Sequence, residues 1–551
     1  MNKARLFLLL TLFVAVCLNV MAADGPSPIE KPGPQKSGFY DFWQLPPGDS
    51  SGVGTLPRTA DCFIGASTQP AVYAGNFLLD CDGETPHNET TIVVDPHNPQ
   101  HAVGGFHSYR LFFNGATLVE RVVAAASSTF DGGSTWHEVI PPITPYQFTG
   151  DPALAFDSNS RLYYSNIADH EGPGGSFTGP SVVVASSNDG GITWSNPVTV
   201  AKGQTAVTPK SKGFGPNIFN DKEYIAADAN ASSPFSNRVY VTWTRFAQFF
   251  SPTAQFFASP INVAVSDNGV QWTAPKAISG FSPFCNAALF GAPNECDLNQ
   301  DSYPAVAPNG KVYVTFENFN TFGLNQILAV SSSDGGATWS APSRVSLVQD
   351  LNFPSNVDGR DTLSGCQLRY GVKANTAVDP SDATGNTVYV AFADNQNGTK
   401  TATNTDVFLG KSTDGGATWS IIPVDTSAND QFYPWVAVAA NGTVSVGYMD
   451  RSLATGADQT QCKYGFAVTK LSKAGSILSK NRVDTGFSDP GHSLWFSGTT
   501  NGNSRFIGDY NGVAVGSDGT TWSLWTDQRA VVANPPSATR NHGQHAVAAK
   551  N

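Results

Sequence analysis

One eight-residue pattern recurs along the chain and constrains its fold more than any other feature. The pattern is Ser/Thr-x-Asp-x-Gly-x-Thr-Trp, and four close copies occur at residues 129–136, 187–194, 332–339 and 412–419. A degenerate copy, VSDNGVQW, spans residues 265–272. The aspartates of successive copies lie 58 to 80 residues apart, so the copies mark repeated structural units.

Each copy has the chemistry of a tight turn. The Asp side chain can accept hydrogen bonds from nearby backbone N–H groups, and Gly adopts backbone angles that other residues resist. The residues before the copies, such as SVVVA at 181–185 and QILAV at 326–330, have the apolar, β-branched character of strands. We therefore expect each copy to be the tip of a β-hairpin, with its Trp packing against the neighbouring sheet.

A second repeated element precedes these turns and has the pattern of a strand, a turn and a strand rich in Val, Tyr and Trp. Its seven copies are Thr90 to Arg110, Asp151 to Asn166, Asp221 to Arg245, Asp301 to Asn318, Asn375 to Asp394, Asp430 to Arg451 and Asp509 to Arg529. Together the two elements make four-stranded antiparallel sheets at propeller-blade spacing. The sequence therefore predicts an all-β protein, a β-propeller of six or seven blades, with seven favoured.

The last repeat is incomplete, which suggests how the ring closes. Residues His545 to Ala549 resemble a third strand with nothing after it. The segment from Cys62 to Asn76 could supply the missing outer strand and hide the open sheet edge. Residues 60–551 are then a single propeller, and six blades remain the alternative if one hairpin lies outside the ring.

The N-terminus has the features of an export signal. Lys3 and Arg5 precede an apolar stretch from Leu6 to Val20, and small residues follow it. We expect residues 1–22 to be a signal peptide and residues 23–59 to be an extended lead-in rich in Pro and Gly. The mature protein is then secreted or periplasmic.

Six cysteines follow this leader, an even number that favours three disulfides in an oxidising compartment. Proximity suggests the pairs Cys62–Cys81, Cys285–Cys296 and Cys366–Cys462, although sequence alone cannot choose among the pairings. No CxxC spacing occurs, and the one His-x-x-x-His spacing, His97 and His101, is interrupted by the turn residues Asn98 and Pro99, so neither a zinc site nor a histidine-based metal centre is expected. Calcium in an acidic ring is possible, and no other cofactor is expected.

The charge balance limits the partners. A net charge of −12 argues against nucleic acid or an anionic membrane as the main partner. No segment after the leader is long and apolar enough to cross a bilayer, so membrane insertion is not expected. We expect a monomer that meets a glycan or glycoconjugate.

In a propeller, the starts of the innermost strands and the ends of the second strands converge on one end of the central channel. Here these positions hold carboxylates and arginines, which suit the binding of an anionic ligand and acid–base chemistry. The candidate site residues among them are Arg245, Arg451, Arg529, Asp151 and Glu317. The structural alternative is that each Asp caps its blade and each Arg pairs with a neighbouring Asp.

The repeated turns resemble the Asp boxes, or BNR repeats, of the sialidase (neuraminidase) superfamily. The stretches NETTIVVD at 88–95 and FIGDYNGV at 506–513 also resemble secreted sialidase-like proteins. The resemblance implies an exo-α-sialidase with three arginines for the substrate carboxylate, a Tyr nucleophile assisted by a Glu, and an Asp acid/base. Arg245, Arg451 and Arg529 would be the triad, with Tyr433 or Tyr510 as the nucleophile.

Two functions from different classes stay open. The first is an exported glycosidase of exo-α-sialidase type, and the second is a non-catalytic propeller that binds a glycan or a protein. The Phe/Tyr-Arg-Ile-Pro motif of true sialidases is absent, and the nearest early arginines are Arg58 and Arg110. A lyase or hydrolase acting on another polysaccharide is a third possibility. Convergent arginines around a Tyr–Glu pair would favour the enzyme, whereas arginines paired with blade aspartates would favour the binding protein.

Overall fold

A computed structural model of the protein describes most of the chain from residue 62 onward. The described residues are 62–65, 69–81, 86–114, 117–170, 179–204, 217–250, 255–287, 291–351, 362–366, 368–399, 402–453, 462–493, 506–532 and 541–551. The predicted signal peptide and lead-in lie outside these ranges. Within them, no helix is long and apolar enough to cross a membrane.

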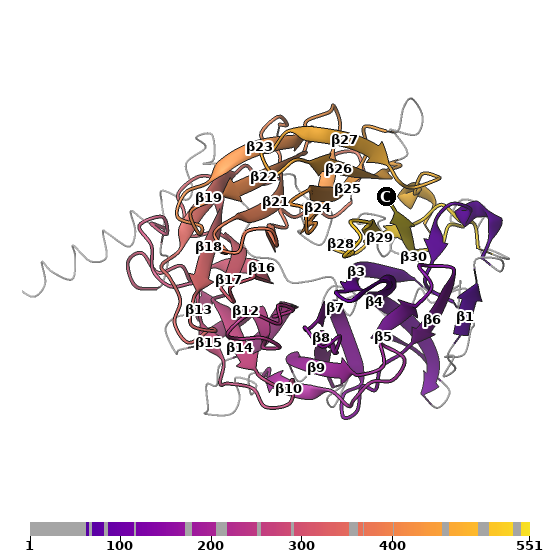
Figure 1. Cartoon of the computed structure of the whole chain (residues 1–551), viewed down its shortest axis with the longest axis horizontal. Coiled ribbons are helices and arrows are strands. Elements are labelled where there is room, and N and C mark those ends of the chain that lie inside the picture. Colours follow the sequence, from indigo (N-terminus) through magenta and orange to yellow (C-terminus); the bar gives the residue numbers. More distant parts are fainter. Residues whose placement is uncertain are drawn as a thin grey trace, which may run out of the picture.

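The strands form seven antiparallel sheets arranged as blades around a central axis (Figure 1). The innermost strands are β3 (His87–Asp95), β7 (Phe148–Phe156), β11 (Asn217–Ala227), β16 (Asn299–Val306), β20 (Asn375–Val378), β24 (Gln431–Val438) and β28 (Gly512–Val515). The second strands are β4 (Asn98–Asn114), β8 (Leu162–Asp169), β12 (Val239–Phe250), β17 (Val312–Asn318), β21 (Val388–Asp394), β25 (Val444–Asp450) and β29 (Thr521–Asp527). The prediction of a seven-bladed all-β propeller is confirmed, and the six-bladed alternative is wrong.

Two further strands complete each blade. The third strands are β5 (Thr117–Thr129), β9 (Ser181–Ser187), β14 (Ile261–Ser266), β18 (Asn325–Ser332), β22 (Asp406–Ser412), β26 (Gly465–Leu471) and β30 (His545–Lys550). The outer strands are β6 (Thr135–Val139), β10 (Val198–Ala201), β15 (Lys276–Ala277), β19 (Ser343–Val348), β23 (Ser420–Asp425), β27 (Ile477–Arg482) and β2 (Phe77–Leu78). An extra strand, β13 (Gln255–Ala258), pairs with β12, and two short 3₁₀ turns, η2 (Ala71–Tyr73) and η3 (Pro490–His492), lie in connections.

The ring closes because a strand from the N-terminal part of the propeller completes the last blade, as expected. The segment that supplies this strand differs from the predicted one. β2 supplies the outer strand of the last blade, where Phe77 pairs with Ala548 and Leu78 with Val547. The segment predicted for this place is wrong in its bounds, because β1 (Cys62–Gly65) instead adds a fifth strand to the first blade beside β6. The two apolar residues of β2 pair with the edge of β30, which a single-sequence pattern of two residues cannot reveal.

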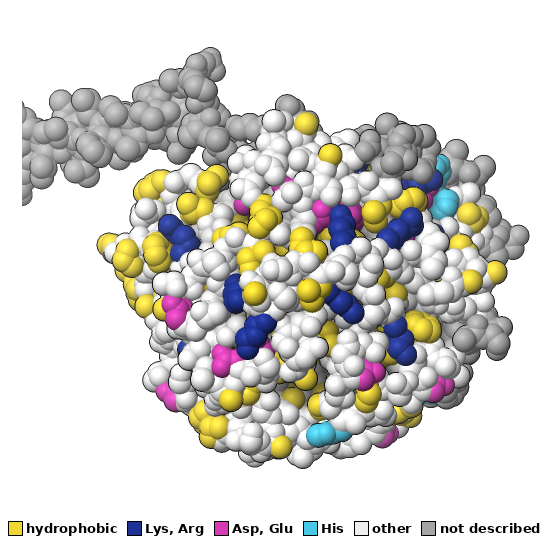
Figure 2. Space-filling model, turned by 45° about the horizontal axis from the view of Figure 1, so that its top comes forward, with side chains coloured by type: hydrophobic (Ala, Val, Ile, Leu, Met, Phe, Trp, Pro, Cys, Tyr) yellow, Lys and Arg dark blue, Asp and Glu magenta, His cyan; other side chains and the backbone are white. Residues whose placement is uncertain are grey.

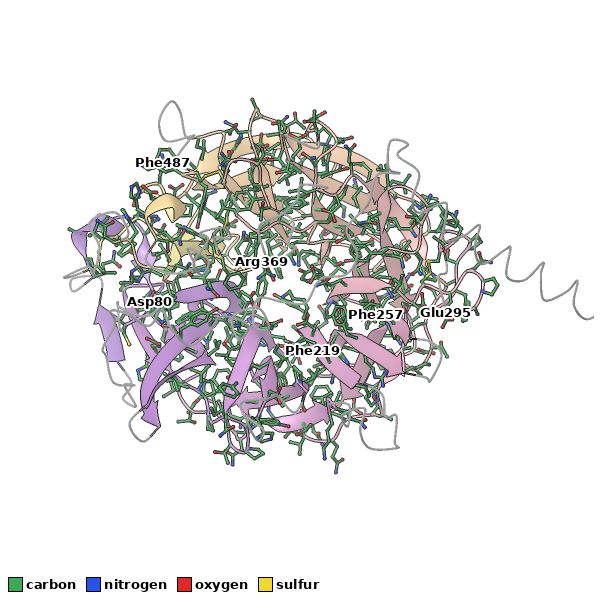
Figure 3. The ribbon with its side chains drawn as sticks, turned by 180° about the vertical axis from the view of Figure 1, so that it is seen from behind. Asp80, Phe219, Phe257, Glu295, Arg369 and Phe487 are labelled. Carbon is green, nitrogen blue, oxygen red and sulfur yellow. A yellow bond between two sulfur atoms is a disulfide. The ribbon has the colours of Figure 1, made fainter. Side chains whose placement is uncertain are left out.

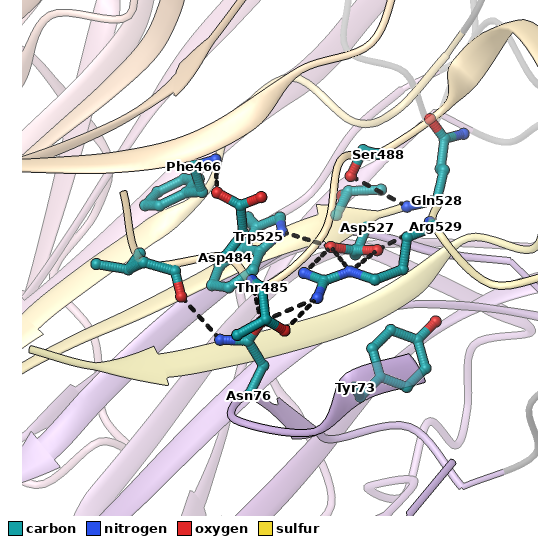
Figure 4. Close-up of polar contacts among 12 residues, drawn as sticks. Tyr73, Asn76, Phe466, Asp484, Thr485, Ser488, Trp525, Asp527, Gln528 and Arg529 are labelled. Atoms are coloured by element: carbon teal, nitrogen blue, oxygen red, sulfur yellow. Dashed lines mark hydrogen bonds and ion pairs between the residues drawn. The ribbon is translucent and has the colours of Figure 1, made fainter. Parts of the chain in front are cut away.

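A buried polar network fastens this closing segment (Figure 4). Arg529, at the end of β29, forms a bidentate ion pair with Asp527 and donates from Nη1 to Asn76 Oδ1 at 3.0 Å. Asn76 also accepts the backbone N–H of Thr485 at 2.9 Å and donates to the Val483 carbonyl at 2.9 Å. Because all these polar atoms are satisfied, the network fixes the closing segment without leaving an unpaired buried charge.

The repeated octapeptides form the turns between the third and outer strands, as predicted. In the fourth blade Asp334 accepts the Thr338 N–H at 2.9 Å, while Ser332 Oγ accepts the Gly336 N–H at 2.9 Å. The Trp339 indole donates to the Gly336 carbonyl at 3.1 Å. Gly336 has a φ of 91°, which explains why the pattern requires glycine there.

The degenerate third copy departs from the pattern in one respect. Asn268, not Asp267, takes the place of the turn aspartate and accepts the backbone N–H groups of Val270 and Gln271. Asp267 is released from the turn and forms an ion pair with Arg238, with 2.6 Å between Nε and Oδ1. The assignment of Asp267 as the turn residue is therefore wrong, because this copy is one residue shorter.

Two of the three predicted disulfides are present, Cys285–Cys296 and Cys366–Cys462. Cys81 is also disulfide-bonded, and its predicted pairing with Cys62 stays a prediction because the Cys62 side chain is outside the described part of the chain. Cys366 lies before the fifth blade and Cys462 within the sixth, so this bridge links two blades.

Candidate functional site

A ring of residues with left-handed backbone conformation lies where the innermost strands begin. In six blades the residue at this point is not glycine and has a positive φ. In five of these six blades the residue is an acidic or basic one. These residues are Glu89 (φ 53°), Asp151 (φ 53°), Lys222 (φ 49°), Asp301 (φ 58°), Lys373 (φ 51°) and Tyr433 (φ 50°). A left-handed conformation costs a non-glycine residue roughly 1–2 kcal/mol, so its repetition here marks the ring as a strained, specialised place.

A β-bulge produces this conformation in the blades. The register between the two innermost strands shifts beside the ring residue in five blades, for example between Asn88 and Thr91 and between Asp221 and Tyr224. A bulge bends the strand and re-aims one side chain. The bulges bring the ring residues within electrostatic range of one another, as the mutual effects of Glu89, Lys222 and Lys373 show.

The first two blades contribute a buried carboxyl pair with a histidine between its members. His107 Nε2 lies 3.5 Å from Glu89 Oε2 and 3.7 Å from Asp151 Oδ1. The Asp151 backbone N–H donates to His107 Nε2 at 2.7 Å, so the ring proton is on Nδ1 and donates to Asn88 Oδ1 at 3.1 Å. Neither carboxyl group has a hydrogen-bond partner among the described residues.

Burial makes these two carboxyl groups weak acids. It raises the pKa of Glu89 to about 8, with a further contribution from Asp509. Burial and the neighbouring Glu89 raise the pKa of Asp151 well above its usual range. Burial and the nearby Lys222 lower the pKa of His107 to about 3. At neutral pH the histidine is therefore uncharged, and the pair retains protons that exposed carboxyl groups would have lost.

Lys222, in the third blade, is a buried cation at the same place. Its ammonium lies 3.2 Å from the centroid of the Tyr510 ring, a cation–π contact that partly replaces its hydration. The ammonium has no hydrogen-bond partner among the described residues, and neither has the adjacent carboxyl group of Glu223. Burial and Asp151 raise the pKa of Glu223 well above its usual range.

A second carboxyl pair lies on the opposite side of the ring, at the end of β17. Glu317 is hydrogen-bonded to Asp350, and Asn325 Nδ2 reaches both, at 3.4 Å from Glu317 Oε1 and 3.5 Å from Asp350 Oδ2. Burial and Asp350 raise the pKa of Glu317 well above its usual range, while burial raises the pKa of Asp350 to about 6. Glu317 is buried and Asp350 is half-buried, so this pair is the more accessible one.

Two cations of the centre are themselves paired, and one of them, Lys373, acts on both carboxyl groups of the second pair. Lys373 Nζ lies 2.6 Å from Asp301 Oδ2, and Arg369 Nη2 lies 3.4 Å from Asp509 Oδ2. Of the residues labelled in Figure 3, Arg369 lies nearest the middle of the ring. The centre therefore contains ammonium, guanidinium and carboxyl groups, which can bind the hydroxyl, amide and carboxylate groups of a polar ligand.

The structure brings only some of the predicted site residues into this centre. Asp151 and Glu317 belong to the two carboxyl pairs. Tyr433 and Tyr510 lie at the ring, but their hydroxyls donate to the carbonyls of Arg369 at 2.7 Å and Pro152 at 3.2 Å. Burial raises the pKa of both tyrosines well above the usual value.

The three predicted arginines do not share one environment. Arg451 Nη1 lies 2.5 Å from Asp430 Oδ2, and Arg529 forms the ion pair with Asp527 in the ring closure. Arg245 is half-buried in β12, and within the described ranges it has no ion pair. Two of the three therefore bind an aspartate of their own blade, as the structural alternative predicted.

Sequence reasoning missed several members of the centre: Glu89, Lys222, Asp350, Arg369, Tyr370 and Lys373. Lys222 directly follows Asp221 and Glu89 directly precedes Thr90, the residues at which the strand pattern began two of its copies. Their position was therefore visible, but the bulge that turns them inward was not. Asp350 and Arg369 lie in connections, whose course in space has no periodic signal. Tyr370 has a buried hydroxyl with no hydrogen-bond partner among the described residues.

Calcium, the ion considered from the sequence, has partial support in the donor set. Glu89 and Asp151 offer four hard oxygen atoms without partners, whereas Ca²⁺ takes about 6–8 oxygen ligands. His107, which lies between these two carboxyl groups, already accepts a backbone N–H through Nε2. These residues alone do not complete a calcium site, and calcium stays a prediction.

The strand pairing and the charged residues at the centre show that the protein is a seven-bladed β-propeller with two carboxyl pairs at one end of its central axis.

No protein-family model matches the chain, and no curated protein matches it. Solved structures similar to it include a protein of unknown function from Dyadobacter fermentans, with 14% identity over 68% of this chain and 93% of that one and a TM-score of 0.41. The NanB sialidase from Streptococcus pneumoniae has 10% identity over 95% of this chain and 99% of its own, with a TM-score of 0.40. An α-L-arabinofuranosidase, Arb93A, from Fusarium graminearum has 13% identity over 74% and 95%, with a TM-score of 0.37.

Proposed function

We propose that the protein is a glycoside hydrolase whose general acid is Glu317, with Asp350 as the carboxyl group that raises its pKa. The observation that carries the proposal is the hydrogen-bonded carboxyl pair at the end of β17, with pKa values raised to different degrees. Glycoside hydrolysis requires a protonated carboxyl group to assist the leaving oxygen and an ionised one to activate water or attack carbon. Glu317 meets the first requirement, whereas the second group must lie about 5–9.5 Å from the acid and is therefore not its hydrogen-bonded partner Asp350.

The roles follow from the two environments. Glu317 keeps its proton at neutral pH and is the general acid that protonates the glycosidic oxygen. Asp350, with a pKa of about 6, is ionised at neutral pH and accepts the hydrogen bond of the protonated Glu317. Asn325 donates to both carboxyl groups and holds them together. Lys373 lies within electrostatic range of both and orients the hydroxyl or carboxylate groups of the sugar.

A sialic acid glycoside is the finer substrate proposal, and it rests on the resemblance of the repeated turns. It needs an arginine site for the substrate carboxylate, for which Arg245, Arg451 and Arg529 were the candidates. The ion pairs of Arg451 and Arg529 with blade aspartates count against their use in binding. Arg245, which has no ion pair within the described ranges, is the better candidate, and a neutral glycoside is compatible with the same centre.

A non-catalytic propeller that binds a glycan is the second candidate, and the same ion pairs favour it. Arg451, Arg529 and Arg369 each bind an aspartate of the protein. Figure 2 shows basic and acidic side chains interspersed over one face. Neither proposal therefore relies on attraction of an anionic ligand by a uniformly positive surface. The disulfides support export to an oxidising compartment, where either function would meet extracellular glycans.

The experiment is turnover of a panel of fluorogenic glycosides, including an α-sialoside and an α-L-arabinofuranoside, by the mature protein. We expect release of fluorophore that falls by 100-fold or more in Glu317→Gln, since general acid catalysis contributes about 10²–10⁴. Glu295→Gln, a glutamate in a loop of the same blade region, is the matched control and should keep full activity. Binding to a glycan array without any release would favour the non-catalytic propeller.

Arg245→Ala separates the sialidase proposal from the broader one. If Arg245 binds the sialic acid carboxylate, this variant loses sialoside turnover and keeps the turnover of neutral glycosides. If Arg245 has no part in binding, all substrates lose activity together or not at all.

A further inference from the structure

A second cluster of metal-ligating side chains lies at the ring closure, away from the channel centre. Asp80 follows β2, His87 begins β3, and His545 begins β30, so two residues that are close in the sequence meet a residue of the last strand. Asp80 Oδ2 lies 2.8 Å from His545 Nδ1 and 3.4 Å from His87 Nδ1. All three side chains are at most 5% exposed. Asp80 lies on the side of the ring where the first and last blades meet (Figure 3).

The remaining polar atoms of the cluster are arranged to orient its members. The second ring nitrogen of His87, Nε2, lies 3.2 Å from the Ser108 hydroxyl. The second carboxyl oxygen of Asp80, Oδ1, accepts the Ala546 backbone N–H at 2.8 Å. Metal-ligating histidines and carboxylates are held in this way, with the outer atom bound to the protein and the inner atom turned to the ion.

We propose that Asp80, His87 and His545 bind a divalent transition-metal ion of the zinc type, which clasps the two chain ends to the first blade. Two imidazoles and one carboxylate are a donor set that suits zinc. The three donor atoms lie within 4.8 Å of one another. Bonds of about 2.0–2.2 Å in a tetrahedral site put neighbouring ligand atoms about 3.3–3.5 Å apart, close to the separation of His87 Nδ1 from Asp80.

Binding changes the proton content of the cluster. Without the ion, a ring N–H of His545 donates to Asp80, which accounts for the 2.8 Å contact. With the ion, both histidines present Nδ1 lone pairs, and the proton of that hydrogen bond leaves to solvent. The ion then joins the segment of β2, the first inner strand and the last strand. These are also held by the two β2–β30 residue pairs, by the backbone hydrogen bonds of Leu79 to Ala546 and of His87 to Gln544, and by side-chain contacts.

The test is metal binding by the full-length mature protein, purified without a metal-affinity tag. We expect one equivalent of zinc by elemental analysis. We also expect one equivalent of Co²⁺ to produce visible d–d absorption when added to the stripped protein. His87→Gln and His545→Gln should each weaken binding at least 100-fold. His492→Gln, a half-exposed histidine on η3, is the matched control and should bind as the wild type does.

Ser108→Ala tests the orientation of His87 without removing a ligand, and we expect binding to weaken about 10-fold to 100-fold. A wild-type protein that is folded but binds neither zinc nor Co²⁺ overturns the proposal and leaves the cluster as a hydrogen-bonded triad. Binding that survives in both histidine variants overturns it as well. If either variant fails to fold, the absorption of the wild-type Co²⁺ complex decides, because imidazole coordination determines its energy and intensity.

Discussion

Replacing Glu89 with glutamine should change the pH dependence of stability more than stability itself. Glu89 is fully buried, and neither oxygen has a hydrogen-bond partner among the described residues. Burial raises its pKa from 4.5 to about 8. Glutamine has the shape of the protonated form and no charge, so the variant retains the packing and loses the titration.

The magnitude follows from proton linkage. A folded-state pKa above the unfolded value gives stability that is complete below about pH 4.5 and is lost as the pH rises toward 8. Between these values the unfolded chain has released the proton and the folded protein has kept it. The wild type therefore loses about 1.4 kcal/mol of unfolding free energy per pH unit through this group, and Glu89→Gln does not.

The assay is urea unfolding followed by tryptophan fluorescence, with disulfides intact, at about pH 5.5 and about pH 7. We expect the free-energy difference between Glu89→Gln and the wild type to shift by about 2 kcal/mol in favour of the variant over this interval. Glu295→Gln should run parallel to the wild type. A difference for Glu89→Gln that does not change with pH would refute the argument, since it would mean that Glu89 ionises as an exposed glutamate does.

Two further predictions concern the fold, and a third concerns the predicted role of Tyr433 as the nucleophile. Arg529→Met leaves the buried Asp527 without its partner and should cost about 3–5 kcal/mol in urea unfolding, whereas a double variant with Asp527→Asn should be more stable than the single one; strictly additive losses would contradict this. Replacing Cys366 and Cys462 with serine should lower the unfolding free energy by about 2–4 kcal/mol, and an unchanged value would show that the bridge does not constrain the unfolded chain. Tyr433→Phe removes one hydrogen bond to a carbonyl, so it should cost about 1 kcal/mol and leave glycoside turnover intact; a loss of 100-fold or more would return Tyr433 to the role of nucleophile.

The repeat was sufficient to predict the architecture. The octapeptide turns, the strand pairs before them and the unpaired last strand predicted seven blades and an exchanged outer strand. The bounds of that strand were wrong because β2 has only two residues, Phe77 and Leu78, too few for a periodic signal. Asp267 was misassigned for a related reason, because a turn that is one residue shorter keeps most residue types of the pattern but not its hydrogen bonds.

The functional centre was predicted only in part. The expectation that strand starts and strand ends converge identified Asp151 and Glu317, which lie in the two carboxyl pairs. It could not identify Glu89 or Lys222, because a bulge and a left-handed φ turn them toward the channel, and neither has a signature in residue type. The cluster of Asp80, His87 and His545 could not be predicted from the sequence either, because Asp80 and His545 are 465 residues apart and no local spacing connects them.

The most direct test of the central claim is the pH dependence of kcat/KM for glycoside hydrolysis. The claim is that Glu317 is the general acid and that Asp350 raises its pKa. We predict a rate that is lost in Glu317→Gln at every pH, and an alkaline limb that moves to lower pH in Asp350→Asn. Turnover that persists in Glu317→Gln, or an alkaline limb that does not move in Asp350→Asn, would contradict the account, as would a folded protein that binds glycans and releases nothing from any glycoside.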